Sequence, residues 1–183
     1  MTQGKNAVSA GKMAEDMVRH SLERAGFVDL AGVLPKRDYK DARMGWFANS
    51  LKAGIARSKD FGNKFFLEQV TIRESIYGNP VKIDFVCHSD RLHNGLVIEC
   101  KTQSVAGSVD EKYPYTHLTL EKIATVNDCK AAFFLGGGGA RQCVYDYLSK
   151  QRSNSFAFFN EQAELLKYLK LPNNDRLMSN EPV

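Results

Sequence analysis

Two short segments of alternating apolar and polar residues, 81–88 and 95–102, constrain the fold of this sequence most strongly. A Gly-Asn-Pro turn at 78–80 precedes the first segment, and a polar stretch at 90–94 separates it from the second. Alternation with a period of two is typical of β-strands, and a polar turn between two such runs predicts an antiparallel hairpin. Residues 65–77 alternate in the same way ahead of the Gly-Asn-Pro turn, so we expect three consecutive antiparallel strands.

Helical periodicity on both sides of these strands completes the expected fold. The helices are predicted at 9–25, 41–56 and 116–127, from the glycine turn 136–139 to about 152, and at 161–170; two further strands are predicted at 130–135 and 156–159. This order predicts an α/β fold with a mixed central sheet flanked by helices on both faces. We expect one domain over residues 1–171 and a polar C-terminal tail at 172–183.

Composition excludes several classes of protein. Of the 183 residues, 43% are hydrophobic and 25% charged, as in folded globular domains and unlike disordered chains. No apolar run approaches the ~20 residues that span a bilayer, and the polar first residues lack the apolar core of a secretory signal. We therefore expect a cytoplasmic protein with no membrane partner. The cysteines form no CxxC pair and are expected to be reduced and mostly buried: Cys87, Cys100, Cys129 and Cys143.

The net charge of +4 comes almost wholly from the first 60 residues. Basic side chains gather there in one polar and aromatic stretch, which suits a surface that contacts a nucleic-acid backbone. A solvated helix face explains the same pattern nearly as well. The candidate nucleic-acid contacts in this stretch are Lys36, Arg37, Lys40 and Arg43, followed by Lys52, Arg57 and Lys59.

The second hairpin strand carries two charged side chains inside an apolar run. Because side chains alternate between the faces of a strand, Glu99 and Lys101 point the same way. Ile98 and Cys100 point into the opposite, apolar layer. One face of a central strand therefore carries both a carboxylate and an ammonium group.

The first hairpin strand adds a second carboxylate, Asp84. Alternation predicts that Asp84 projects with Val86, and that the opposite apolar face is formed by Ile83, Phe85 and Cys87. If the two strands pair around residues 89–94, Asp84 lies beside Glu99 and Lys101. Burying such charges is costly unless they pair or bind a cation. Two carboxylates, a backbone carbonyl and waters suit the oxygen shell of Mg²⁺, and Lys101 can orient a water that the metal activates.

These residues resemble the signature of the PD-(D/E)XK nuclease superfamily, which has the restriction-endonuclease-like fold. Its pattern is a carboxylate on one strand and a (D/E)xK triplet on the next, here Asp84 and then Glu99-Cys100-Lys101. Glu15 resembles the carboxylate that many members carry on their first helix. Gln103, two residues beyond Lys101, belongs to the same resemblance. Ile83 stands where the pattern has proline, and the likeness covers roughly residues 9–148.

The resemblance implies a Mg²⁺-dependent endonuclease that hydrolyses phosphodiester bonds in DNA, of the restriction-enzyme or phage type, with Mn²⁺ able to replace Mg²⁺. It implies that Asp84, Glu99, Glu15 and the backbone carbonyl of Cys100 hold the metal. Lys101 would position the attacking water. Further candidate nucleic-acid contacts are Gln103, Lys112 and Arg141.

Alternatives stay open at this point. A structure-selective nuclease such as a junction resolvase would share the site, and a catalytically silent nucleic-acid-binding domain would keep the fold. A small-molecule hydrolase would need a nucleophile and base, and the sequence shows no such pair. Because one such site cuts one strand, we expect a homodimer on double-stranded DNA, formed through apolar residues of the predicted helix 41–56: Met44, Trp46, Phe47 and Leu51.

Overall fold

The fold is built on a six-stranded mixed sheet, and a computed structural model describes it over residues 3–44, 63–72, 75–92, 94–103 and 112–171. The strands lie in the order of the chain: β1 (Val28–Asp29), β2 (Phe65–Ile72), β3 (Val81–His88), β4 (Leu96–Thr102), β5 (Lys130–Gly136) and β6 (Phe156–Phe159). β2, β3 and β4 are antiparallel neighbours, as predicted, whereas β1 runs parallel to β2 and β4, β5 and β6 run parallel to one another. The mixed sheet that the sequence predicts is confirmed.

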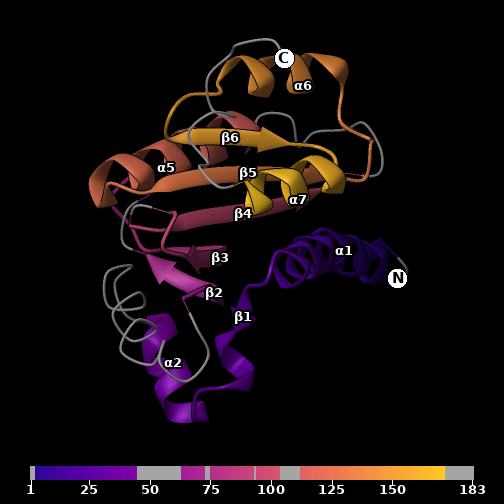
Figure 1. Ribbon diagram of the computed structural model, residues 1–183. Helices are drawn as coiled ribbons and strands as arrows, with labels where there is room; N and C mark the ends of the chain where they lie inside the picture. Colours follow the sequence, from indigo (N-terminus) through magenta and orange to yellow (C-terminus); the bar gives the residue numbers. More distant parts are fainter. Residues whose placement is uncertain (1–2, 45–62, 73–74, 93, 104–111, 172–183) are drawn as a thin grey trace.

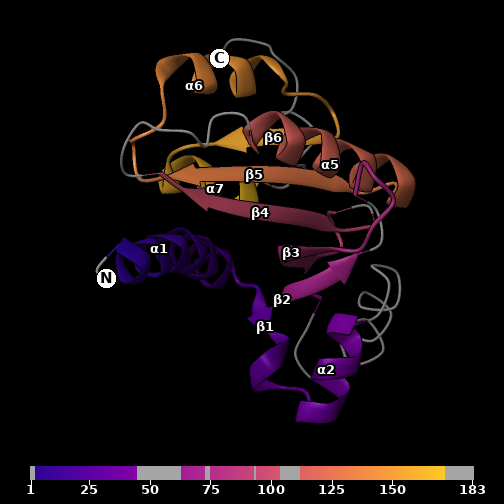
Figure 2. The ribbon, with the colours of Figure 1, turned by 180° about the vertical axis from the view of Figure 1, so that it is seen from behind.

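Helices cover both faces of this sheet. They are α1 (Gln3–Arg24), the 3₁₀ turn η1 (Leu30–Gly32), α2 (Lys36–Met44), α5 (Lys112–Asn127), α6 (Gln142–Lys150) and α7 (Gln162–Lys170). α1 and α7 share one hydrophobic core with the sheet, and α2, α5 and α6 contribute to a second core on the other face. α7 lies in front of the sheet in Figure 1, and α5 lies in front of it in the reverse view of Figure 2. The predicted α/β architecture is therefore confirmed.

Some predicted boundaries differ from the structure. α2 begins at Lys36, directly after Pro35, whose carbonyl accepts a hydrogen bond from the Tyr39 amide at 3.0 Å. Proline favours the start of a helix because its ring fixes φ and it has no N–H to leave unpaired. The helix predicted from residue 41 thus starts five residues earlier. The rest of that prediction lies outside the described residues, as does the predicted tail 172–183. The predicted contacts that also lie outside them are Trp46, Phe47, Leu51, Lys52, Arg57 and Lys59.

The core follows the alternation of the strands except in β3 and its neighbour β2. Ile83 was expected to share a face with Phe85 and Cys87, and this prediction is wrong. Ile83 packs instead with Val86 in the core on the α5 side, whereas Phe85 and Cys87 pack on the α1 side. The alternation of side chains between the two faces of β3 is therefore interrupted at Asp84, a charged residue between the apolar Ile83 and Phe85.

The ladder of the neighbouring strand β2 is interrupted opposite the same position of β3. β2 pairs Glu68 with Phe85 and Val70 with Ile83, and the ladder omits Gln69 and Asp84 between these pairs. Gln69 has a φ of 55°, in the left-handed region that non-glycine residues rarely adopt. Because both strands are disturbed together, the register is the same before and after the interruption.

Two further expectations concern membranes and cysteines. Among the described residues, no helix has the length and apolar character needed to cross a bilayer. The four cysteines are free thiols, with Cys87, Cys100 and Cys129 buried and Cys143 exposed. Burial raises the pKa of the Cys129 thiol to about 12, so this thiol is uncharged and unreactive at neutral pH.

The glycine turn after β5 supports the end of β4. Gly139 donates its N–H to the Gln103 carbonyl at 2.7 Å, and Gln103 donates its own N–H to the Gly136 carbonyl at 3.1 Å. Gly137 has a φ of 91°, and a Cβ at this position would lie 2.6 Å from the Gln103 carbonyl oxygen. Gly137 is therefore required by close backbone approach as well as by its conformation.

We expect Gly137→Ala to destabilise the fold more than Gly138→Ala. Gly138 also has a positive φ, of 65°, but no atom lies within 4 Å of where its Cβ would be. Gly138→Ala should cost about 1 kcal/mol for conformation alone, and Gly137→Ala about 1–3 kcal/mol more for the clash. Urea denaturation of both variants measures the difference. Equal stabilities would show that the turn tolerates a side chain beside Gln103.

Candidate active site

Asp84 lies where β3 and β4 separate. The ladder between these strands extends over Phe85–Ile98, Val86–Val97 and Cys87–Leu96 and includes no pair beyond Phe85. Instead, the Asp84 carboxylate accepts a hydrogen bond from the Cys100 N–H, with 2.7 Å between Oδ2 and the nitrogen. A side chain thus takes the place of a backbone carbonyl, and it fixes Asp84 against the strand that carries Glu99 and Lys101.

Gln69 holds the other oxygen of the same carboxylate. Its Nε2 amide donates to Asp84 Oδ1 at 3.0 Å, so both oxygens of Asp84 have donors from flanking strands. The Arg43 guanidinium lies 3.4 Å from the Gln69 carbonyl oxygen. Sequence reasoning missed Gln69, because a glutamine in a strand gives no sign of a left-handed backbone.

Glu99 and Lys101 lie on one face of β4, as predicted, and form an ion pair. Only 12% of the Glu99 side chain is exposed, against 41% for Lys101. Burial raises the pKa of the Glu99 carboxyl to about 7; the Lys101 charge opposes this shift and the Asp84 charge adds to it. Burial alone would lower the pKa of Lys101, but the charge and hydrogen bond of Glu99 outweigh it and raise that pKa. The pair is therefore strongly coupled.

One oxygen of Glu99 has no protein partner. Glu99 Oε2 is buried and accepts no hydrogen bond. The hydroxyl of Thr119 on α5 is also buried without a hydrogen-bond partner. Both residues line a cavity of about 40 Å³, together with Val81, Ile83, Tyr115, Thr116 and Leu120. Such a space has room for a water molecule, which needs polar partners of this kind. An unpaired buried carboxylate oxygen is also a ready acceptor for a cation.

Glu15 of α1 adds a third carboxylate to the group. Partial burial raises the pKa of Glu15, the negative charges of Asp84 and Glu68 raise it further, and the positive charge of Arg19 opposes them. Arg19 also binds Glu68 directly through a forked contact, with 3.1 Å between Nη2 and Oε2. The acidic charge near Asp84 thus comes from α1, β2 and β4, and only part of it is neutralised by Arg19 and Lys101.

The donors in this group are oxygen atoms, which hard divalent cations prefer. Within the ranges that the structure describes, no three Asp, Glu, His or Cys side chains already converge as a metal cage. The reason is visible in the contacts: Asp84 is held by Gln69 and Cys100, and Glu99 is paired with Lys101. The unpaired Oε2 of Glu99 fits a cation ligand, and the remaining ligands would have to change partners to bind one.

The predicted nucleic-acid contacts lie on several elements. Lys36, Arg37 and Lys40 are exposed on α2, Lys112 is exposed at the start of α5, and Arg141 is exposed at the cap before α6. Arg43 is half-buried over the Tyr39 ring, 5.4 Å from its centroid, so it also supports the fold.

Gln103 departs from its predicted role. Its side chain was expected to lie on a surface that contacts nucleic acid, but only 6% of the residue is exposed. The Tyr113 hydroxyl donates a hydrogen bond to Gln103 Oε1 inside the core. Gln103 follows the last residue of β4, where the chain enters the glycine turn described above. It is a core residue of this turn and is not available for a surface contact.

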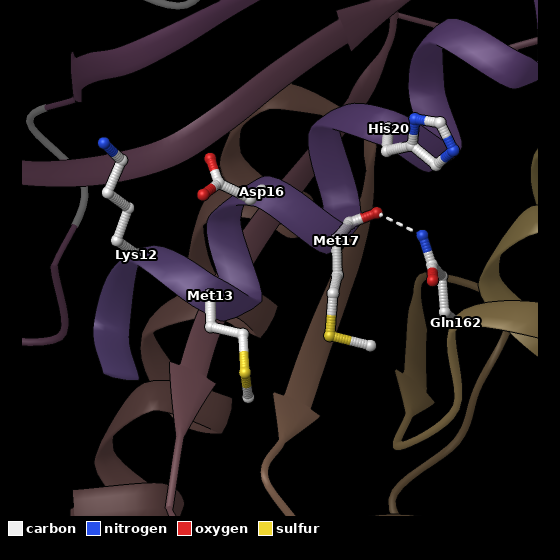
Figure 3. A pocket seen from close by; sticks show the side chains of 6 residues that line it. All are labelled: Lys12, Met13, Asp16, Met17, His20 and Gln162. Carbon is white, nitrogen blue, oxygen red and sulfur yellow. Dashed lines mark hydrogen bonds between the residues drawn. The ribbon is translucent and has the colours of Figure 1, made fainter. Parts of the chain in front are cut away.

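A groove also lies between α1 and the first residue of α7 (Figure 3). It has a volume of about 460 Å³ and is lined by Lys12, Met13, Asp16, Met17, His20 and Gln162. The Gln162 amide donates to the Met17 carbonyl at 2.9 Å and so joins the two helices. The lining is mainly apolar and does not include Asp84, Glu99 or Lys101, so the groove is separate from the charged group.

Comparison with known proteins assigns the chain to a family. A family profile described as a PD-(D/E)XK nuclease superfamily domain matches residues 6–174. The match covers α1 from residue 6 onward, the hairpin of β3 and β4, and all later described strands and helices. The chain therefore belongs to the PD-(D/E)XK nuclease superfamily, as its sequence resemblance indicates, and this supports a nuclease-type hydrolase.

Other comparisons add little. No curated protein matches the sequence. One solved structure, titled a crystal structure of protein of unknown function AF1548, is similar with 14% identity and a TM-score of 0.39. The similarity covers 70% of this chain and 64% of that one, so this chain spans less than two thirds of its length.

We expect Gln69→Gly to be more stable than Gln69→Ala. Both variants lose the hydrogen bond to Asp84, but only alanine keeps a Cβ in the left-handed conformation, which costs about 1 kcal/mol. Urea denaturation of the two variants beside the wild-type protein measures this. If the alanine variant were equally stable, the left-handed backbone at Gln69 would not be under strain.

Proposed function

We propose that the chain is a metal-dependent endonuclease that hydrolyses phosphodiester bonds in DNA, of the restriction-enzyme or phage type. The observation that carries the proposal is the bond from the Cys100 N–H to Asp84, because it holds a carboxylate beside the strand that presents Glu99 and Lys101. A chain of a nuclease superfamily thus has two carboxylates and an ammonium group at one strand end.

The oxygen donors support a metal site. Asp84, Glu99 and the Cys100 carbonyl would hold the cation, and Glu15 would complete its shell through water or bind a second ion. Mg²⁺ suits this donor set because it prefers carboxylate, carbonyl and water oxygens. When bound, it would polarise a phosphate oxygen and lower the pKa of a bound water.

Lys101 would act on the reacting groups. Its ammonium is partly exposed and anchored by Glu99, so it can hold a water and balance negative charge on the phosphate. Hydrolysis joins the water oxygen to phosphorus and breaks one P–O bond, which leaves a phosphate monoester and a hydroxyl. Gln69 would be a positioning residue, since it acts through Asp84.

Exposed basic side chains support DNA as the substrate. Lys36, Arg37 and Lys40 lie on α2, which packs against β2, and Lys112 begins the helix that covers Glu99. Such residues bind phosphates without reading sequence. One site cuts one strand, so cleavage of both strands of a duplex would require a homodimer or two successive nicks.

We expect Asp84→Asn, Glu99→Gln and Lys101→Ala each to lower the cleavage rate at least about 100-fold while leaving the protein folded. The lost groups act on the reacting atoms, and two of the changes preserve shape. Glu15→Gln should have a milder effect, since its carboxylate lies on a separate helix. Lys150→Ala, a change of an exposed lysine on α6, serves as the control and should cleave at the wild-type rate.

Rates are measured on supercoiled plasmid, linear duplex, single-stranded DNA and a four-way junction. Preference for the junction would indicate a structure-selective nuclease, and binding without cleavage would indicate a silent domain. Wild-type rates in the Asp84, Glu99 and Lys101 variants would refute the site.

We expect Mg²⁺ or Mn²⁺ to support cleavage, and Ca²⁺ to support binding with little turnover. Ca²⁺ is larger and accepts looser coordination, so it holds substrate without the geometry that hydrolysis needs. Cleavage assays with each chloride salt and with excess EDTA, after removal of bound metal, test this. Full activity in EDTA would exclude a metal-dependent mechanism.

A further inference from the structure

Two exposed tyrosines stack on each other beside the candidate site. The rings of Tyr77 and Tyr115 have centroids 5.7 Å apart and planes inclined by 27°. Tyr77 is 74% exposed and Tyr115 is 37% exposed, so both residues reach the surface. Tyr77 lies in the turn between β2 and β3, and Tyr115 lies in the first turn of α5. Two residues far apart in the sequence thus form one aromatic surface.

The turn that carries Tyr77 is firmly held. Gly78 donates its N–H to the Ser75 carbonyl at 2.8 Å, and Asn79 donates to the Ser75 hydroxyl at 3.0 Å. The Lys122 ammonium of α5 donates to the same Ser75 carbonyl at 2.9 Å, which ties the turn to the helix that carries Tyr115. The aromatic pair is therefore pre-organised, and binding to it would cost little conformational entropy.

The pair is adjacent to the candidate active site. Tyr115 lines the same cavity of about 40 Å³ as Glu99, and Val81 and Ile83 of β3 line it too. Asp84 follows Ile83 directly in the chain. A group that stacks on the tyrosines would therefore lie close to the phosphate that the carboxylates and Lys101 act on.

The surroundings of the pair favour a nucleic acid over a protein partner. Lys112 lies one helical turn before Tyr115 and is exposed, and Lys82 is exposed on β3. Aromatic faces with basic neighbours bind single-stranded nucleic acid, because every base has a face that can stack and every nucleotide a phosphate. In a paired duplex the faces of the bases are already stacked, so only an unpaired base is free to use such a surface.

We propose that Tyr77 and Tyr115 form a stacking platform for an unpaired nucleobase of the substrate, next to the bond that is cut. This inference rests on the proposed nuclease activity and favours a structure-selective nuclease over the restriction-enzyme type, because the substrate would be DNA with an unpaired base at the cleavage point, as in a bulge, fork or junction. Tyr77 is the outer member of the platform because it is the more exposed ring.

The test compares two DNA duplexes that differ in one base. Each carries the fluorescent base 2-aminopurine, either paired or as a single unpaired bulge, and binding is followed in Ca²⁺. For wild type and Tyr77→Phe we expect the unpaired base to be quenched on binding. For Tyr77→Leu we expect no quenching and an affinity for the bulged DNA about 5- to 150-fold lower, with affinity for the paired DNA changed less than twofold.

Two controls separate stacking from other effects. Leu118→Ala alters another exposed apolar residue of α5, 47% exposed, and should bind both DNAs like wild type. Sedimentation of wild type and Tyr77→Leu without DNA reports whether the tyrosines join two copies of the chain. A dimer that dissociates in the variant would show a protein interface and overturn the proposal.

The remaining outcomes distinguish the platform from the proposed function. If Tyr77→Leu lowered the affinity for the paired and the bulged DNA equally, or lowered neither affinity, the proposed stacking platform would be refuted. This would hold even if the wild-type protein cleaves DNA in Mg²⁺. If the wild-type protein quenched the unpaired base and Tyr77→Leu lost affinity for the bulged DNA alone, but no DNA were cleaved, the platform would be supported and the nuclease activity rejected. A wild-type protein that binds neither DNA would reject both.

Discussion

The hydrogen bond from the Cys100 N–H to the Asp84 carboxylate is the interaction on which the candidate site depends. The backbone ladder between β3 and β4 ends at the pair Phe85–Ile98. Beyond this pair, the Asp84 side chain links the two strands by accepting the hydrogen bond from the Cys100 N–H. This bond brings one strand's carboxylate beside the next strand's Glu99 and Lys101. It also explains why the alternation of β3 breaks there, since Asp84 turns toward its neighbour strand instead of standing on one face.

The charges around this bond are only partly balanced. The negative charges of Asp84 and Glu68 act on Glu15, and the charge of Asp84 acts on Glu99. Arg19 pairs with Glu68, and Lys101 pairs with Glu99. Like charges held together raise the pKa values of carboxyl groups and cost stability unless a cation is bound. The site is therefore organised for a ligand of positive charge, and this arrangement supports the proposed metal better than any single residue does.

The sequence predicts this part of the molecule well because the signals are local. Alternation sets the positions of Glu99 and Lys101 on β4, and β3 has the predicted bounds, 81–88. The rest depends on contacts that no local pattern encodes. Gln69 adopts a left-handed backbone through contacts with Asp84 and Arg43, and Gln103 is buried by Tyr113 and the glycine turn. The strand β1 has two residues, too few for a periodic signal.

The contact between Gln162 and the Met17 carbonyl has a consequence for synthesis of the protein on the ribosome. It joins α1 to α7 across 145 residues, and both helices share the core on one face of the sheet. α1 carries Glu15, so this carboxylate receives its last support only when α7 has left the ribosomal exit tunnel. Until then α1 has only its contacts with β1, β4 and β5 to hold it on the sheet. Full packing of the helix that carries Glu15 therefore depends on a helix that is synthesised near the end of the described fold.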